Sequence, residues 1–154
     1  MTPEQQAAWD RFQAETADAR QPYDIIAFGD GPALADELLA LVLSGTKQAT
    51  AARLNLYKTM GMRPPAPGDL SLVLDGSGRP ACVIETTRVE IAPFNTAPED
   101  FAWAEGEGDR SLEHWQAAHL SYFHRECARE GSFFSEDEPI VFERFRLIWT
   151  PGTQ

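Results

Sequence analysis

The chain has 154 residues, a length that fits one domain. Its 24 acidic and 13 basic side chains give a formal net charge of −11 at pH 7, which excludes a protein that grips an extended nucleic acid through many phosphate contacts. Hydrophobic residues make up 43% of the chain, so general disorder is excluded as well.

The N-terminal part of the sequence predicts two helices separated by an extended segment. The first helix spans about residues 2–19, where Pro3 suits the first turn. A short apolar run over 23–28 follows and predicts extended backbone. Pro32 then begins a helix whose apolar residues recur at helical spacing, and Gly45 ends it.

The rest of the sequence predicts a mixture of strands and helices. Strands are predicted within 46–56 and over 70–74, 81–91 and 140–149, a loop over 62–68, a helical turn near 97–102 and a helix over 111–130. Asp75-Gly76 is typical of a tight hairpin turn, so the two strands that it joins are antiparallel. We therefore expect an α+β fold, with a small curved sheet or barrel and helices packed outside it.

One stretch of the chain is basic and a later one is acidic. No acidic residue occurs over 38–68, and the basic residues there are Lys47, Arg53, Lys58 and Arg63. This basic stretch is either a chance arrangement on a solvated loop or the positive wall of a pocket for an anionic or carbonyl-bearing ligand. The acidic stretch over 99–109 is either a solvent-exposed loop before a helix or the source of a carboxylate for proton transfer.

Two residue types that suit nucleophilic catalysis lie three positions apart in the basic stretch. A lysine in a partly dry pocket loses proton affinity and can act as a base, as Lys47 would. A threonine hydroxyl beside it can then become a nucleophile, as Thr50 would. This spacing is common in proteins and does not by itself indicate an enzyme.

The sequence predicts no metal site and no cofactor. His114, His119 and His124 follow one another at intervals of five residues, which rotate a helix by about 140°, so they do not share a face. We interpret His119 as a structural histidine on an apolar stripe. Cys82 and Cys127 are far apart without a CxxC motif, and we expect both to be reduced and buried.

No membrane partner is expected from the sequence. It has no apolar run of the ~20 residues that a membrane span needs. Its first residues are polar and acidic, unlike the basic and apolar start of a signal peptide. We therefore expect a cytoplasmic protein.

Several motifs resemble those of ASCH-domain proteins. They are FGD at 28–30, SGTKQAT at 44–50, PGD at 67–69, IETT at 84–87, AEGEGDRSL at 104–112, FSEDEP at 134–139 and ERF at 143–145. The most specific is the string over 104–112. The resemblance implies a single domain over 1–154, in which 1–22 is an N-terminal helical extension and 23–149 is a PUA-like, mostly antiparallel β-barrel.

The resemblance also implies a cleft beside the barrel and a link to RNA or modified nucleosides. Similar members include amidohydrolases that remove acyl groups from N4 of cytidine, which implies Lys47, Thr50 and a glutamate as catalytic residues. Glu107 matches that glutamate best, with Glu105 as the alternative. Many family members have a glutamate where this chain has Thr50, and this departure favours the amidohydrolase version of the motif. The expected substrate-binding residues are Phe28, Arg53, Tyr57, Glu105 and Arg110.

Three functions remain open at this point. In the first, Lys47 activates Thr50 to attack the acyl carbon of N4-acylcytidine, and Glu107 passes a proton to the leaving amino group. In the second, a ribonuclease uses Lys47 with Tyr57 or Ser111 to act on the 2′-hydroxyl of single-stranded RNA. In the third, the protein binds RNA without catalysis. All three predict a nucleoside or a short RNA as the partner, and none defines the oligomeric state.

Overall fold

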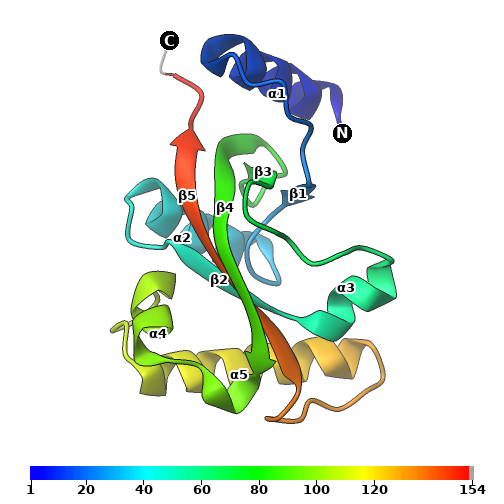
Figure 1. Cartoon of the computed structure of the whole chain (residues 1–154), viewed down its shortest axis with the longest axis vertical. Helices are drawn as coiled ribbons and strands as arrows, with labels where there is room; N and C mark the ends of the chain where they lie inside the picture. Colours follow the sequence, from blue (N-terminus) through cyan, green and yellow to red (C-terminus); the bar gives the residue numbers. More distant parts are fainter. Residues whose placement is uncertain (153–154) are drawn as a thin grey trace.

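A computed structural model of the chain describes residues 1–152 (Figure 1). Its helices are α1 (Pro3–Thr16), α2 (Pro32–Leu43), α3 (Leu54–Met60), α4 (Glu99–Glu105) and α5 (Leu112–Arg129), with a 3-10 turn η1 (Phe94–Thr96). Its strands are β1 (Asp24–Ile26), β2 (Ala49–Arg53), β3 (Leu70–Leu74), β4 (Pro80–Pro93) and β5 (Pro139–Trp149). The fold is α+β, as the sequence predicts. No helix within the described residues is long and apolar enough to cross a membrane.

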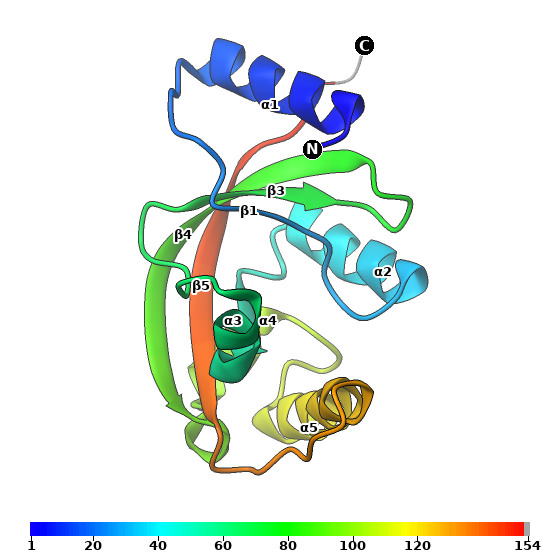
Figure 2. The same cartoon turned by 90° about the vertical axis from the view of Figure 1, so that its right-hand side faces the viewer.

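The strands form one mixed sheet in the order β1-β3-β4-β5-β2. β1 pairs in parallel with β3, and every other neighbouring pair in this order is antiparallel. The register of β4 against β5 shifts at Val83/Ile84 and at Thr86/Arg88, and such irregularities bend a strand. The long strands β4 and β5 therefore curl into a half-barrel, with α2, α3 and α5 on its concave side (Figure 2).

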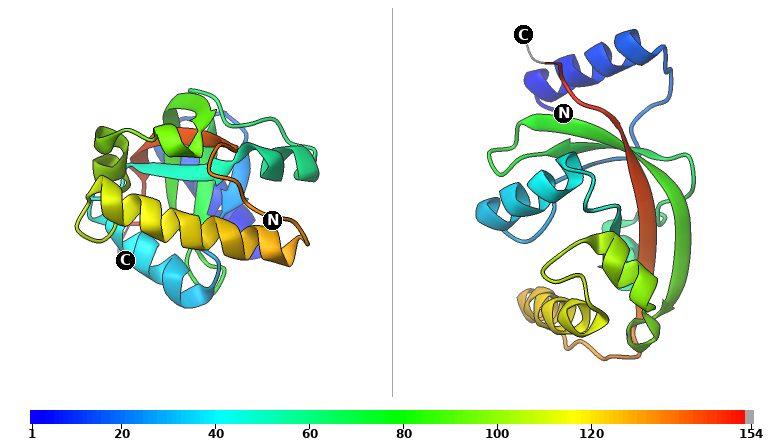
Figure 3. Two further views of the ribbon diagram at one scale, coloured as in Figure 1. Left: turned by 90° about the horizontal axis from the view of Figure 1, so that it is seen from below. Right: turned by 90° about the vertical axis from the view of Figure 1, so that its left-hand side faces the viewer.

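Three hydrophobic clusters hold the helices against the sheet. Trp9 and Phe12 of α1 are buried against β3, β4 and β5 at one end of the molecule. Val42 of α2 belongs to a second cluster in the middle of the sheet, and Phe123 of α5 to a third that includes α4. Figure 3 shows α1 and α5 at opposite ends, with α2 between them. The region between α2 and α5 is thus bounded by two separate clusters.

Two short elements differ from the sequence-based expectation. The strand predicted within 46–56 ends at Arg53, and α3 follows at once. No residue of α3 is buried, and its seven residues are too few for a helical repeat to stand out in the sequence. α4 is longer than the single turn expected near 97–102. Cys82 and Cys127 are free and buried, as predicted.

Candidate functional site

A cavity of about 450 Å³ lies between α2 and α5, and β1, β2 and α3 contribute further walls. Ser71 of β3 and Glu143 of β5 also line it. All the expected site residues except Arg53 and Arg110 face this cavity: Phe28, Lys47, Thr50, Tyr57, Glu105 and Glu107. The fold therefore brings together residues from most of the length of the chain.

Lys47 is a fully enclosed cation in the wall of this cavity. Its side chain is 1% exposed, and Nζ donates to Glu105 Oε1 at 2.8 Å and to Glu107 Oε2 at 3.0 Å. The backbone amide of Gln48 donates to the carbonyl of Ala104 at 2.6 Å. This bond ties the segment before β2 to the end of α4 and so places Lys47 beside both glutamates.

Gly106 allows the two segments to approach this closely. Its φ is +72°, a conformation that favours glycine. A Cβ atom at this position would lie 2.4 Å from the carbonyl oxygen of Thr46, which is backbone and cannot rotate away. The turn that carries Glu105 and Glu107 therefore requires glycine between them.

We expect Gly106→Ala to lower the thermal unfolding midpoint and to pull the glutamates away from Lys47. The positive φ costs roughly 1–2 kcal/mol for a residue with a side chain, and the contact with Thr46 adds to this cost. Gly131→Ala is a matched control, because Gly131 has a φ of +74° and an added Cβ would meet no atom within 4 Å. Equal losses of stability in the two variants would contradict the close approach at Gly106.

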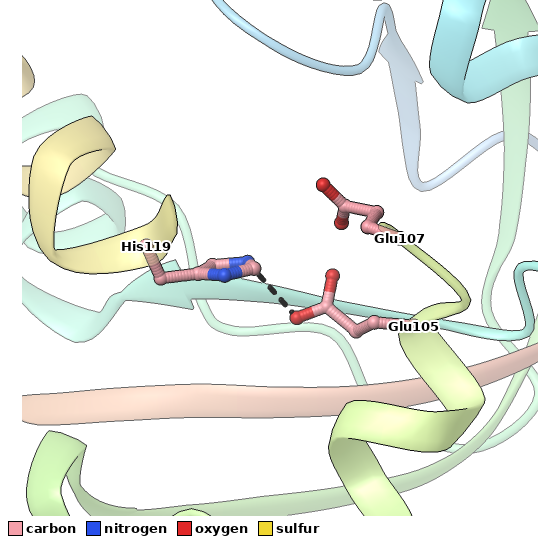
Figure 4. Close-up of side chains that lie close together, drawn as sticks. All are labelled: Glu105, Glu107 and His119. Carbon is pink, nitrogen blue, oxygen red and sulfur yellow. Dashed lines mark ion pairs between the residues drawn. The ribbon is translucent and has the colours of Figure 1, made fainter. Parts of the chain in front are cut away.

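Glu105 anchors the buried end of this cluster. Its Oε2 accepts a hydrogen bond from the indole Nε1 of Trp115 and lies 3.0 Å from Nε2 of His119. Figure 4 shows the ion pair of Glu105 with His119. The other ring nitrogen of His119, Nδ1, lies 2.9 Å from the carbonyl oxygen of Trp115. Since a carboxylate and a carbonyl both accept, both ring nitrogens donate, and the imidazolium form is favoured.

The charges of this cluster stabilise one another. Burial alone would lower the pKa of Lys47, but Glu105 and Glu107 outweigh it and raise that pKa. Burial likewise opposes ionisation of Glu105 and His119, yet their mutual attraction holds the pKa of Glu105 well below its ordinary value and raises the pKa of His119. Burial raises the pKa of Glu107. These contacts favour the ammonium form of Lys47, which suits stabilising negative charge better than it suits the expected role as a base.

A second polar group faces the cavity from the sheet. Glu143 of β5 is the direct cross-strand partner of Thr50 of β2. Glu143 is 8% exposed, and its Oε2 accepts a hydrogen bond from Thr86 Oγ1 at 2.6 Å. Burial raises the pKa of Glu143 to about 7. Within residues 1–152, the hydrogen bonds of Lys47 Nζ go to the two glutamates and not to Thr50.

Sequence reasoning missed Glu143 as a residue of the cavity. It interpreted His119 as structural, which agrees with the contacts of this ring to Glu105 and Trp115. Glu143 follows the apolar run 140–142 in a predicted strand, where a carboxylate is costly to bury without a purpose. His119 stands four residues after Trp115 on the buried face of α5, and its ring stacks on that indole with centroids 4.3 Å apart.

Phe28 and Tyr57 form aromatic parts of the cavity wall. Phe28 is 6% exposed and stacks on Phe145 at a centroid distance of 6.0 Å, so it belongs to the core as well as to the cavity. Lys47 Nζ lies 5.6 Å from the centre of the Phe28 ring. Burial raises the pKa of the Tyr57 hydroxyl, which therefore stays protonated over the physiological pH range.

Arg53 does not lie in the cavity. Its side chain is 4% exposed and points toward α5 and the segment before β5. There it pairs with Glu126 at 2.9 Å, Glu130 at 3.1 Å and Glu138 at 2.7 Å. Arg53 therefore holds β2 against α5 and is not available to a ligand of the cavity.

The other expected cations are also engaged elsewhere. The guanidinium of Arg110 lies 3.8 Å from the centre of the Trp103 ring, outside the cavity. Arg63 pairs with Asp69 at 2.7 Å. The basic stretch over 38–68 thus contributes one cation, Lys47, to the cavity and does not form a positive wall.

Glu105, Glu107 and His119 have the residue types of a metal site. One ligand atom from each lies within 4.8 Å of the others. The ammonium of Lys47, however, lies within hydrogen-bonding distance of both carboxylates and supplies the positive charge that a metal ion would bring. The donor set is therefore already satisfied by side chains of the chain itself.

Comparison with known proteins identifies relatives of this fold and sequence. A family model described as the ASCH domain matches residues 24–149. The crystal structure of an ASCH domain from Lactobacillus crispatus JV V101 is 33% identical, with a TM-score of 0.86 over 96% of this chain and 95% of that one. Protein EF3133 from Enterococcus faecalis V583 is also 33% identical, with a TM-score of 0.87 over 96% of this chain and 90% of that one.

A more distant structure shares the fold alone. Hypothetical protein PH0355 is 13% identical, with a TM-score of 0.52 over 81% of this chain and 96% of that one. No curated protein matches the chain significantly. The matched segment of the family model contains the cavity residues from β1 to β5.

Proposed function

The chain belongs to the ASCH-domain family, which has a PUA-like RNA-binding fold, and on this basis we propose that the cavity hydrolyses the acyl amide of an N4-acylated cytidine. The observation that carries the proposal is the buried ammonium of Lys47, paired with Glu105 and Glu107 in a cavity that also holds Thr50. Amide hydrolysis needs a nucleophile, positive charge for the oxyanion and an acid for the leaving group.

The size and walls of the cavity suit one nucleoside. Its volume of about 450 Å³ is typical of small-ligand sites. Phe28 and Tyr57 offer aromatic surfaces against which a pyrimidine ring can pack. A free nucleoside, or a single nucleotide that projects from an RNA, is therefore the ligand we propose.

The charge of the cavity favours a neutral ligand. Its charged groups nearly balance: the carboxyl groups of Asp24, Glu105, Glu107 and Glu143 share it with Lys47, Arg125 and the imidazolium of His119. Arg125 is already paired with Asp30 at 3.0 Å. Because Lys47, His119 and Arg125 are each paired with a carboxyl group, they offer no free positive charge to a phosphate group, and an uncharged amide needs none.

The residues take the following roles in the proposed reaction. The hydroxyl oxygen of Thr50 attacks the acyl carbon and forms an ester as the C–N bond breaks. The ammonium of Lys47 stabilises the negative oxygen of the tetrahedral intermediate. Glu107, whose pKa is raised by burial, gives a proton to the leaving N4 amino group. Water then hydrolyses the ester and frees Thr50.

The ribonuclease alternative has less support from the positions of its residues. Ser111, one of its candidate groups, caps α5, and its hydroxyl donates to Asp109 at 2.6 Å outside the cavity. Tyr57 does face the cavity, but its raised pKa makes it a poor base. RNA binding without catalysis is the remaining alternative, and it differs from the proposal by the absence of a product.

We expect N4-acetylcytidine to be hydrolysed with a kcat/KM no lower than that of its 5′-monophosphate, because the cations that line the cavity are already paired with carboxyl groups and do not bind the added charge. Cytidine release is followed by chromatography, and labelled single-stranded RNA is tested in parallel. Cleavage of the RNA without cytidine release would contradict the proposal and identify the protein as a ribonuclease. Saturable RNA binding with no product would reduce it to a binding module.

A further inference from the structure

From the pairing of β2 with β5 we infer that Glu143 is the general base that takes the proton of the Thr50 hydroxyl. This inference rests on the proposed function and adds a catalytic residue to it. The role needs a residue other than Lys47, since that lysine is held as an ammonium by its hydrogen bonds to Glu105 and Glu107. Glu143 is the one carboxylate of the cavity that stands opposite Thr50 in the sheet.

The sheet places the two side chains on the same face. Thr50 and Glu143 are direct partners in the antiparallel register of β2 and β5. Directly opposed residues of an antiparallel pair project to the same side, with Cβ atoms about 4.5–5.5 Å apart. Both side chains line the cavity, so the space that they share is also the space that the substrate would enter.

The surroundings of Glu143 leave one oxygen free for this task. Oε2 accepts the hydrogen bond from Thr86, which is itself 2% exposed and fixed in β4. Oε1 has no hydrogen-bond partner within the described part of the chain, and the carboxyl faces the cavity. It can accept from Thr50 directly or through one water molecule, as catalytic contacts in unliganded enzymes commonly do.

The charged and titratable neighbours of Glu143 agree with this role. Burial and the carboxylates of Asp69 and Asp24 raise its pKa to about 7, while the bond from Thr86 lowers it in part. Tyr57, also in the cavity, stays protonated, because burial and the charge of Glu143 raise its pKa. A base with a pKa near the working pH is the most effective kind.

The Lys47 cluster lines other walls of the same cavity, and its cations are paired with its own carboxyl groups. Its members are Lys47, Glu105, Glu107 and His119. Burial and the charge of Glu143 also raise the pKa of Tyr23, which lies just before β1 and lines the cavity. None of these groups stands in the cross-strand position that Glu143 occupies opposite Thr50.

The protons balance over the whole cycle. In the first half, the carboxylate of Glu143 takes the proton of Thr50 as the new C–O bond forms, and Glu107 gives its proton to N4 as the C–N bond breaks. In the second half, Glu107 takes a proton from the attacking water. Glu143 returns its proton to the oxygen of Thr50 as the ester breaks, so both carboxyl groups regain their starting states.

The test compares Glu143→Gln with the wild type in N4-acetylcytidine hydrolysis over pH 5 to 9. We expect wild-type kcat/KM to rise with pH through an apparent pKa near 7, because Glu143 must lose its proton to act. Glu143→Gln should lower kcat/KM by roughly 10²–10⁴-fold and remove this rise. Glu90→Gln, an exposed glutamate on β4, is the control and should leave rate and profile unchanged.

Thr86→Val provides a second measurement. Its pH profile would not change if Glu143 had only a structural role. Loss of the hydrogen bond from Thr86 should raise the pKa of Glu143. The increase in kcat/KM should then occur at higher pH and reach the same maximum value. A wild-type enzyme that hydrolyses the substrate, with an unchanged profile in both variants, would overturn the inference and leave the proposed function intact. A wild-type protein that releases no cytidine would overturn both.

Discussion

Thr50→Val is expected to lower kcat for N4-acetylcytidine by at least about 10⁴-fold, because it removes the nucleophilic oxygen. Valine keeps the branched shape of threonine in β2, so the fold and the cavity wall should persist. The expected change in unfolding midpoint is small, and KM or substrate binding should stay within a few-fold of the wild type. Steady-state kinetics and thermal unfolding measure the two effects separately.

Thr50→Ser is the matched rescue variant for this position. Serine restores a hydroxyl on the same strand and should recover much of the lost rate. With the wild type, quenched samples should carry one acyl group on the peptide that contains Thr50, as mass spectrometry would detect. Full activity in Thr50→Val would remove the threonine from the mechanism and point to direct attack by water.

Lys47→Ala is expected to lose both activity and stability. Its removal leaves Glu105 buried beside Glu107 without the ammonium that pairs with both, a change that typically costs about 3–5 kcal/mol of unfolding free energy. Loss of the oxyanion-stabilising charge should lower kcat by at least about 10²–10³-fold. Chemical denaturation and steady-state kinetics test the two parts.

Lys58→Ala is the control for this variant, because Lys58 is an exposed lysine on α3. It should change the unfolding free energy by less than about 0.5 kcal/mol and leave the rate unchanged. A Lys47→Ala protein as stable as the Lys58→Ala protein would show that the buried ion pairs do not hold the site together.

The fold was largely predictable because its main elements carry local signals. The apolar spacing after Pro32, the Asp75-Gly76 turn and the Ser111 cap each correspond to an observed element. α3 was missed for a physical reason. It spans only seven residues and has none that is fully buried, so its apolar residues do not make a helical repeat that the sequence would reveal.

The protonation states and ion pairs of the site residues were less predictable than the identities of those residues. The motifs identified Lys47, Thr50 and Glu107, but the pKa of Lys47 depends on Glu105, which is 58 positions away along the chain. The same limit applies to Arg53. The family resemblance assigned it to the substrate, whereas the fold pairs it with three glutamates of other segments. Long-range pairing of charges decides both outcomes.

The choice between Glu105 and Glu107 also needed the fold. Both glutamates contact Lys47 in the fold. The sequence could not show whether one of them or both would do so. Glu105 is enclosed by Trp115 and His119, whereas the side chain of Glu107 is 21% exposed. This difference supports Glu107 as the proton carrier and Glu105 as the residue that positions Lys47.

The most direct test of the account is cytidine release from N4-acetylcytidine by the purified wild type, Lys47→Ala and Glu107→Gln, followed by chromatography. We expect release by the wild type and its loss in both variants, with Glu107→Gln still folded because glutamine keeps the shape of the side chain. No release by the wild type, or equal release by all three proteins, would contradict hydrolysis at the Lys47 cavity.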